Sequence, residues 1–446
     1  MVDTIAGYQK PHYLLFLMKV KDYFFKWLVV VYALYLFFNK GISYGYFSEI
    51  TLVLGALLIW RERKIIEISW DRRTKWLAVL IGFNFLWMLR GFLSYPFLDV
   101  IRDSFIFNYA FLLLIPFLYP DRLQELRTKI VTLYAWFPIV VTVCFLFTLW
   151  FPALAQWQLF GNIPLLEYKR GDLGVHLLFC AILMLSGTLK LEPRWQAINY
   201  VLILYLFLVV ATLNRGGMVA FLLGGWLFVH LSKKTAALPS LRPYLRYVPL
   251  VLFLSAALYA FTDLEDTVQG RNAGFDQLKK NVVSIVDRDV EGSLSGNIIW
   301  RLAWWGTILD YTLAGPYFLQ GKGLGINLAQ DDGVALEEDA DRAVLRSPHN
   351  FHLTILARYG VPIFCAWLLF LAALFAPLFK KGALEHASED LKIFLPFFLA
   401  TLINATFDVA LEGPMSAFPF WLLIGIYLAT DHRRSYIPQG PRSSGV

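Results

Sequence analysis

The sequence predicts an all-α polytopic membrane protein with about twelve transmembrane helices and one long loop. Of the 446 residues, 58% are hydrophobic, 17% are aromatic and only 16% are charged, and the mean hydropathy is +0.56. Soluble domains average about 45–50% apolar and about 25% charged residues, so this composition is typical of a chain that lies largely in lipid. Long apolar stretches with few charges recur along the sequence, and they are interrupted by a single long polar stretch.

Each apolar stretch is close to the roughly 20 residues that a helix needs to cross about 30 Å of hydrocarbon. Several are short or contain Pro or Gly, which membrane helices tolerate because neighbouring helices satisfy the freed backbone groups. The weakest of the set are 45–60 and 103–118. The predicted transmembrane helices are 23–38, 45–60, 76–93, 103–118, 130–150, 171–189, 197–213, 216–231, 246–262, 360–378, 391–408 and 414–430.

The positions of Lys and Arg predict the orientation, because cytoplasmic loops are enriched in these residues. With the N-terminus inside, the inner segments carry about two dozen of them and the short outer loops about five. The outer ones are Lys40, Arg102, Lys169, Arg170 and Arg215. An even number of helices places both termini in the cytoplasm. The net charge of +7 is therefore explained by topology, and no nucleic-acid partner is expected.

This topology divides the chain into four parts. Residues 1–262 form the first nine transmembrane helices, 263–348 form the outer loop, 349–430 form the last three helices, and 431–446 form a cytoplasmic tail. A loop of this length is usually functional or disordered, and this one is acidic.

Two segments of the outer loop are predicted to be helices. Residues 296–313 have apolar and aromatic residues at helical spacing, which predicts an amphipathic helix at the outer membrane surface. Trp300, Trp304 and Trp305 would there join the aromatic belt of the interface. Residues 274–286 predict a second, shorter helix.

His349 is the main candidate for chemistry. It follows Pro348 where the acidic loop meets an apolar helix, with Arg346 and Asn350 close by in the sequence. A neutral imidazole, with an ordinary pKa of about 6.5, can take a proton from a hydroxyl group, whereas an arginine cannot. A capping or structural role explains the same position equally well.

Two arginines are candidates for binding an anion. Arg215 ends an apolar stretch at the outer edge and precedes two glycines, which permit close approach of a ligand or a neighbouring backbone. Arg301 lies on the apolar side of the predicted helix 296–313. A snorkelling side chain that anchors a helix at the membrane surface is the alternative explanation for either residue.

A combination of motifs around these residues resembles a known family. The stretch SLSGNIIWRLAWWGTILDYTLAGPYFLQGKGLG contains an S-G-N-x-R-like helix and a G-x-G-x-G-like turn, and RSPHNFHLTILARYGVPIF contains an H-N-x-x-L…G helix start. Together with Arg215 they resemble the O-antigen ligase and polymerase superfamily of bacterial membrane glycosyltransferases. The resemblance extends from Arg215 to Phe364. The arginine of the helix motif stands after Ile-Ile-Trp, so Arg288, in VDRDVEG, can share or take over the role of Arg301.

The resemblance implies a GT-C-like transferase that works without a metal or cofactor, with its site at the periplasmic face of the bacterial inner membrane. The donor would be a glycan on undecaprenyl diphosphate. The acceptor would be a sugar hydroxyl, on the lipid A–core oligosaccharide for a ligase or on another glycan repeat for a polymerase. The ligase is favoured because the signature resembles that branch more closely.

The resemblance also implies a role for each candidate residue. His349 would be the catalytic base. The diphosphate would be bound by Arg215 and Arg301, with Arg288 as the further candidate. Arg346 and Asn350 would contact the acceptor or support the site.

Two other interpretations compete with this one. The Asp-x-Asp pattern at 287–289 is used by many glycosyltransferases to hold a metal, but so short a pattern arises easily by chance in an acidic loop. A flippase for lipid-linked oligosaccharides would also have many helices. Such a transporter is expected to show repeat symmetry and cations within its central helices, whereas the candidate residues here gather at the outer face.

Overall fold

The computed structural model describes residues 12–63, 68, 70–233, 249, 253, 264–266, 271–273, 293–334, 345–379 and 388–436. Within these residues the chain is helical apart from two short antiparallel strands, β1 (Leu264–Asp266) and β2 (Arg271–Ala273), so the all-α prediction is confirmed. Most of the predicted helix 246–262, all of the predicted helix 274–286, and Arg288 lie outside the described residues.

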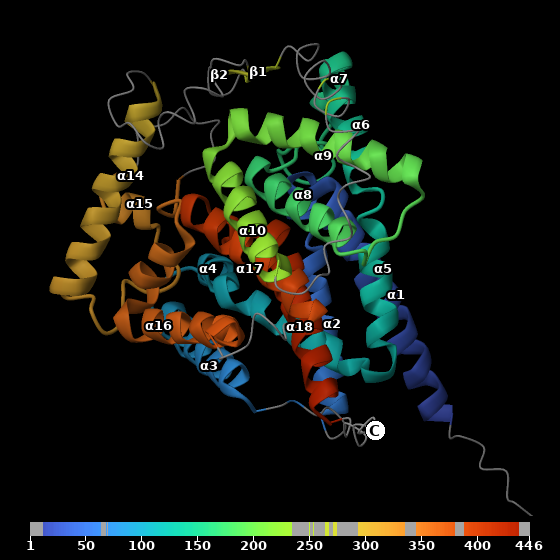
Figure 1. Cartoon of the computed structure of the whole chain (residues 1–446). Helices are drawn as coiled ribbons and strands as arrows, with labels where there is room; N and C mark the ends of the chain where they lie inside the picture. Colours follow the sequence, from blue (N-terminus) through green and yellow to red (C-terminus); the bar gives the residue numbers. More distant parts are fainter. Residues whose placement is uncertain are drawn as a thin grey trace, which may run out of the picture.

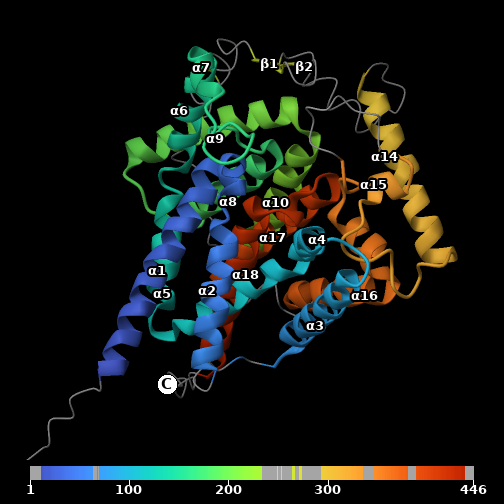
Figure 2. The same cartoon turned by 180° about the vertical axis from the view of Figure 1, so that it is seen from behind.

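The helices form one assembly in which segments far apart in the sequence pack together (Figure 1). Figure 2 shows the same helices from behind. The α-helices are α1 (His12–Phe38), α2 (Phe47–Glu62), α3 (Arg72–Phe92), α4 (Phe97–Asn108), α5 (Leu123–Leu133), α6 (Phe137–Trp150), α7 (Pro152–Ala155), α8 (Arg170–Leu185), α9 (Pro193–Leu213), α10 (Arg215–Lys233), α14 (Ser293–Leu309), α15 (Leu328–Asp331), α16 (Phe351–Phe375), α17 (Glu389–Phe407) and α18 (Pro414–Tyr436). The 3-10 helices are η1 (Asn39–Gly45), η2 (Tyr109–Leu118), η3 (Pro120–Arg122), η5 (Ala376–Phe379) and η6 (Ala410–Glu412). The segment η4 (Asp310–Ala314) is a π-helix.

Seven helical segments of the described residues are long and apolar enough to cross a membrane. They are Met18–Gly45, Phe97–Leu118, Pro120–Trp150, Pro193–Leu213, Arg215–Ser232, Phe351–Phe379 and Glu389–Phe407. A multi-pass membrane protein is therefore supported, while the predicted count of twelve is not confirmed. One reason is length: α2 and α8 have 16 residues each, and such a helix is only about 24 Å long.

The helices α8, α10 and α17 pack against one another, and glycines allow α8 and α10 to approach closely. A Cβ atom on Gly174 of α8 would lie 2.9 Å from the carbonyl oxygen of Gly217 in α10. One on Gly224 would lie 3.0 Å from the carbonyl oxygen of Pro396 in α17. Small residues at such contacts let membrane helices pack backbone to backbone. The first turns of α8 and α10 consequently lie side by side, with Gly217 packed on Gly171.

The predicted loop helix is present as α14, which continues into the π-helical turn η4. It lies at the edge of the molecule beside α15 (Figures 1 and 2). Its residues Trp304 and Ile308 are fully buried and form a small separate core with Leu328 of α15 and Leu356 of α16. This core attaches the loop helix to the start of α16, where His349 lies.

The two sides of α14 correct one expectation from the sequence. Trp304 is fully buried and donates a hydrogen bond to Asp332, so its predicted place in an aromatic belt at the membrane surface is wrong. The exposed side of the helix instead carries Ile299, Leu302 and Leu309. An apolar exposed side is what a helix resting in lipid requires.

The helix α16 begins nine residues before the predicted apolar stretch 360–378 and is broken at Gly360. Gly360 has φ 78° and ψ −179°, a conformation that disfavours any residue with a Cβ atom. The chain of residues 318–320 passes against this break, so a Cβ on Gly360 would lie 2.6 Å from the carbonyl oxygen of Phe318. The amide of Val361 donates to that same oxygen at 2.8 Å. The break thus lets the loop dock onto α16.

We predict that Gly360→Ala destabilises the protein by about 2–4 kcal/mol, because the new methyl group meets both a left-handed backbone and a carbonyl oxygen. The matched control is Gly82→Ala in α3, where a Cβ has no neighbour within 4 Å. That change should raise stability slightly, by about 0.5–1 kcal/mol. Thermal unfolding of the purified variants in detergent measures both, and equal melting temperatures for the two would contradict the assigned role of Gly360.

Candidate functional site

His349 is held in a strained backbone conformation between two anchored neighbours. Its φ is +52°, in the left-handed region that few residues other than glycine adopt. On one side, the indole of Trp305 donates a hydrogen bond of 2.8 Å to the carbonyl oxygen of Pro348. On the other, the side chain of Asn350 caps α16 by accepting from the amides of His352 and Leu353 at 3.1 and 3.2 Å. The imidazole is therefore aimed by α14 and α16 together.

The imidazole faces a carboxylate that it shares with a lysine. Nδ1 of His349 lies 4.0 Å from Oδ1 of Asp408, the residue that ends α17. Nζ of Lys169, which precedes α8, lies 3.2 Å from the same oxygen atom. The ring of Trp300 stands edge-on to the imidazole, with 6.2 Å between the ring centres.

The two predicted anion-binding arginines gather at the same end of α17. Nη1 of Arg301 donates a hydrogen bond of 3.1 Å to the carbonyl oxygen of Phe407, and its guanidinium lies over the ring of Trp300. Arg215 begins α10, and a Cβ on the next residue, Gly216, would lie 2.9 Å from Cβ of Phe407. The structure thus brings α10, α14 and α16 to the end of α17, although these elements are separated along the sequence.

Burial and the nearby cations keep His349 neutral. Burial is the main cause that lowers the pKa of His349 to about 4; the charges of Arg301 and Lys169 act in the same direction, and Asp408 acts in the opposite one. Burial alone would raise the pKa of Asp408, but Lys169, His349 and the amide of Val409 hold it below its usual range. The site at neutral pH therefore contains an uncharged imidazole beside a carboxylate and an ammonium group.

The position of Lys169 is set by a polar frame that includes the turn η1. The side-chain oxygen of Asn39 accepts from the amide of Lys169 at 3.1 Å, and its nitrogen donates to the buried Asp172 at 3.4 Å. Asp172 also accepts from Asn404 of α17 at 3.0 Å. This frame connects the first outer turn, the start of α8 and the end of α17.

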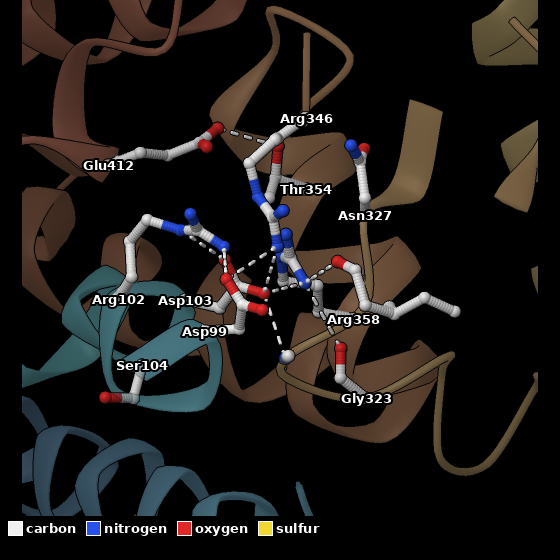
Figure 3. A network of polar contacts seen from close by, with 12 residues as sticks. Asp99, Arg102, Asp103, Ser104, Gly323, Asn327, Arg346, Thr354, Arg358 and Glu412 are labelled. Atoms are coloured by element: carbon white, nitrogen blue, oxygen red, sulfur yellow. Dashed lines mark hydrogen bonds and ion pairs between the residues drawn. The ribbon is translucent and has the colours of Figure 1, made fainter. Parts of the chain in front are cut away.

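Arg346, the remaining predicted site residue, lies in a different cluster (Figure 3). Its Nη2 is 3.8 Å from Asp99 and 3.7 Å from Asp103, both on α4. Asp103 also forms a 2.7 Å ion pair with Arg358 and accepts from the amide of Gly325 at 2.9 Å. We call Asp99, Asp103, Arg346 and Arg358 the Asp103 network.

The Asp103 network fastens the predicted glycine-rich turn, residues 321–325, to the membrane helices. Arg358 of α16 donates to the carbonyl oxygens of Gly323 and Ile326 at 3.3 and 3.2 Å (Figure 3). Lys322 of the same turn pairs with Asp331 and Asp332. These contacts satisfy several polar groups of the turn within the protein and hold the loop against α4, α15 and α16.

The sequence interpretation missed Lys169 and Asp408 as parts of the site. Lys169 was noticeable only as one of the few basic residues in the outer loops, and Asp408 only as an acidic residue at the end of the apolar stretch 391–408. Neither residue lies near His349 in the sequence. Among the described residues, no group of three or more His, Cys, Asp or Glu is placed to hold a metal ion, and a metal-independent reaction stays a prediction.

Comparison with known proteins supports the resemblance noted in the sequence. Residues 200–368 match a family described as O-antigen ligase. This range includes Arg215, Arg301 and His349, whereas Lys169 and Asp408 lie outside it. No curated protein matches the chain.

We predict that Arg358→Ala lowers the stability by about 3–5 kcal/mol, because it removes the closest and most buried ion-pair partner of the buried Asp103. The two side chains are only 3% and 5% exposed. Arg194→Ala is the matched control, since the Arg194–Glu192 pair is 74% and 66% exposed and such pairs contribute at most about 1 kcal/mol. Thermal unfolding distinguishes them, and an Arg358 variant as stable as the control would show that the Asp103 network does not hold the loop.

Proposed function

We propose, from the membership of residues 200–368 in the O-antigen ligase and polymerase superfamily, that this protein is an O-antigen ligase. Proteins of this family are glycosyltransferase-like enzymes that act on lipid-linked glycans. The donor is then a glycan on undecaprenyl diphosphate, and the acceptor is a sugar hydroxyl of the lipid A–core oligosaccharide. The observation that carries the proposal is the neutral imidazole of His349 beside the cationic Arg301, at the end of α17 where α10 begins.

The tautomer of His349 follows from its surroundings. Nδ1 faces the carboxylate of Asp408, which favours the proton on that nitrogen. Nε2 then carries the lone pair and accepts the proton of the acceptor hydroxyl. The resulting imidazolium is stabilised by the carboxylate of Asp408. Other sites that activate a hydroxyl group likewise use a third residue to orient the base.

The deprotonated hydroxyl oxygen attacks the anomeric carbon of the donor sugar and forms the new glycosidic bond. The bond between this carbon and the diphosphate oxygen breaks, and its electron pair leaves with undecaprenyl diphosphate. Negative charge grows on the diphosphate during this step. Arg215 and Arg301 supply guanidinium groups, which bind phosphate oxygens in a fixed geometry and stabilise that charge. Arg288 remains the further candidate for this role.

The arrangement also suits a lipid-linked donor. A diphosphate on a long polyprenyl chain must stay at the headgroup level while its chain lies in lipid, so its binding groups belong at helix ends. Arg215 begins α10, and α14 has an exposed apolar side next to the site. The loop core around Trp304 covers the start of α16 and supports exclusion of water, which would compete with the acceptor.

The predicted location is the bacterial inner membrane, with the site on the periplasmic side and both termini in the cytoplasm. The start of α1 and the end of α18 lie at one end of the molecule, and the strands of the loop lie at the opposite end (Figures 1 and 2). That arrangement supports an even number of crossings. The clustering of the site at one end of α17 also favours an enzyme over a flippase, whose cations belong within its central helices.

A polymerase is the second candidate, because the family includes polymerases that use the same chemistry on another glycan repeat. Deletion of the gene followed by gel analysis of the lipopolysaccharide separates the two activities. Loss of every O-antigen-capped core indicates the ligase that we propose. A core that still carries one repeat indicates a polymerase and would contradict the proposal.

We predict that His349→Ala abolishes glycan transfer while donor binding survives, since only the base is removed. His349→Asn should behave alike, and asparagine tolerates the left-handed backbone, so a folding defect is avoided. Arg215→Ala should weaken donor binding and turnover together. Lipopolysaccharide gels of complemented deletion cells measure transfer, with the exposed His230→Ala as the control. Normal long-chain lipopolysaccharide from both His349 variants would contradict the role of this residue.

The pH dependence of kcat/KM should follow the depressed pKa of His349. A base is lost as pH falls through its pKa, so activity should stay level from pH 7 to about 5 and decline nearer to about 4. Arg301→Gln removes a cation that lowers this pKa and should move the decline to higher pH, besides reducing the rate. A decline centred at pH 6.5 in the wild type, or a shift to lower pH in the variant, would contradict the assignment.

A further inference from the structure

We infer that Lys169 is a third cation for the leaving diphosphate, contributed by the part of the chain that lies outside the family match. The inference rests on the proposed function and deepens it, because it assigns a ligand-binding role to a residue that the motifs around His349 do not include. It starts from the contacts of one ammonium group.

Lys169 has more hydrogen-bond donors than the protein satisfies. Its side chain is only 12% exposed, and its only ion-pair partner among the described residues is Asp408. Nζ is buried and has no hydrogen-bond partner in the described part of the chain. An ammonium group has three N–H donors, and a buried donor without an acceptor is costly. Oxygen atoms of a bound anion would satisfy the donors that remain.

The local structure of α8 does not explain a lysine at this position. Lys169 is the residue that caps the N-terminus of the helix, where Ser, Thr, Asp and Asn are favoured for their side-chain oxygen atoms. The helix dipole also disfavours a cation there and favours an anion. Its side chain makes no capping hydrogen bond. A lysine at this position therefore lowers the stability of the helix. A role in binding an anion would explain why it is nevertheless present.

The start of α8 lies where the diphosphate is expected. A Cβ on Gly217 would lie 3.3 Å from the carbonyl oxygen of Arg170, so the chain at Lys169 and Arg170 packs on the first turn of α10, which begins with Arg215. The charge of Lys169 acts on His349, as does that of Arg301. Two cations, Lys169 at the start of α8 and Arg301 of α14, thus act on the imidazole, and the first turn of α10, which begins with Arg215, packs beside Lys169.

Asp408 gives the lysine a partner when no donor is bound. Its Oδ1 faces both Nζ of Lys169 and Nδ1 of His349. When the N–H groups of Lys169 turn to phosphate oxygens, the same carboxylate is left to stabilise the imidazolium that proton transfer creates. Asp408 is therefore a positioning residue that serves the lysine before the donor binds and the histidine afterwards.

Binding of undecaprenyl diphosphate without a glycan tests the inference, with the purified full chain in lipid nanodiscs. Lys169→Gln should weaken binding by about 10- to 100-fold, the usual effect of losing a charge-assisted hydrogen bond. Lys169→Arg should keep the affinity within a few-fold. Lys40→Gln is the control, because Lys40 is a half-exposed lysine that pairs with Glu167 on the same side of the molecule.

A double variant separates binding from neutralisation of Asp408. If Lys169 only balances the charge of Asp408, Lys169→Gln combined with Asp408→Asn should bind as tightly as the wild type, and this result would overturn the inference. If Lys169 binds the diphosphate, the double variant stays as weak as Lys169→Gln. Unchanged binding by Lys169→Gln also overturns the inference and leaves the proposed function intact. Failure of the wild type to bind undecaprenyl diphosphate would instead overturn both.

Discussion

The close contact between α8, α10 and α17 is the constraint on which the site depends. Gly174 and Gly217 let the first turns of α8 and α10 touch, and Gly224 brings α10 onto α17. A Cβ atom at Gly174, Gly217 or Gly224 would lie 2.9, 3.1 or 3.0 Å from the backbone of the neighbouring helix, which is closer than ordinary van der Waals contact, so the helices would have to shift. The residues that begin α8 and α10 and end α17 would then separate. The geometry around His349 is thus a result of backbone packing in a different part of the chain.

This packing places charges where they change the chemistry of one imidazole. The charges of Arg301 and Lys169 act on His349, while a single carboxylate, Asp408, acts in the opposite direction. Burial disfavours a protonated ring, and the cations oppose a further positive charge, so the base is kept uncharged. The same cations attract a diphosphate, whose arrival would offset their effect on the ring. A site that binds an anionic leaving group can in this way hold a neutral base ready for the acceptor.

The all-α fold class could be predicted from the sequence because it depends on local patterns, and the candidate site around His349 was likewise proposed from local motifs. Apolar stretches identify membrane helices, and α14 follows from periodicity, whereas the first turns of α16 precede the predicted apolar stretch 360–378. The number of crossings was harder, since α2 and α8 are apolar but only 16 residues long. Lys169 and Asp408 were missed for another reason. Their place in the candidate site depends on the packing of α8, α16 and α17 against one another. This tertiary packing cannot be read from a local sequence pattern. The buried side of Trp304 was likewise set by packing on α15.

Two buried cations, Arg358 and Lys169, differ in how completely the described residues satisfy their hydrogen-bond donors, and this difference distinguishes a structural role from a ligand-binding one. In the Asp103 network, Arg358 meets a carboxylate and two carbonyl oxygens, and Asp103 also accepts from a backbone amide. That part of the network closes on itself, as a structural clamp should. Lys169 instead has one ion-pair partner among the described residues for three donors. Folding alone would favour a neutral or capping residue at the start of α8, because an incompletely paired buried charge is destabilising. The unpaired N–H donors of Lys169 are explained if the substrate supplies their hydrogen-bond acceptors. The binding free energy of the anion then offsets the free-energy cost of a buried, incompletely paired ammonium group.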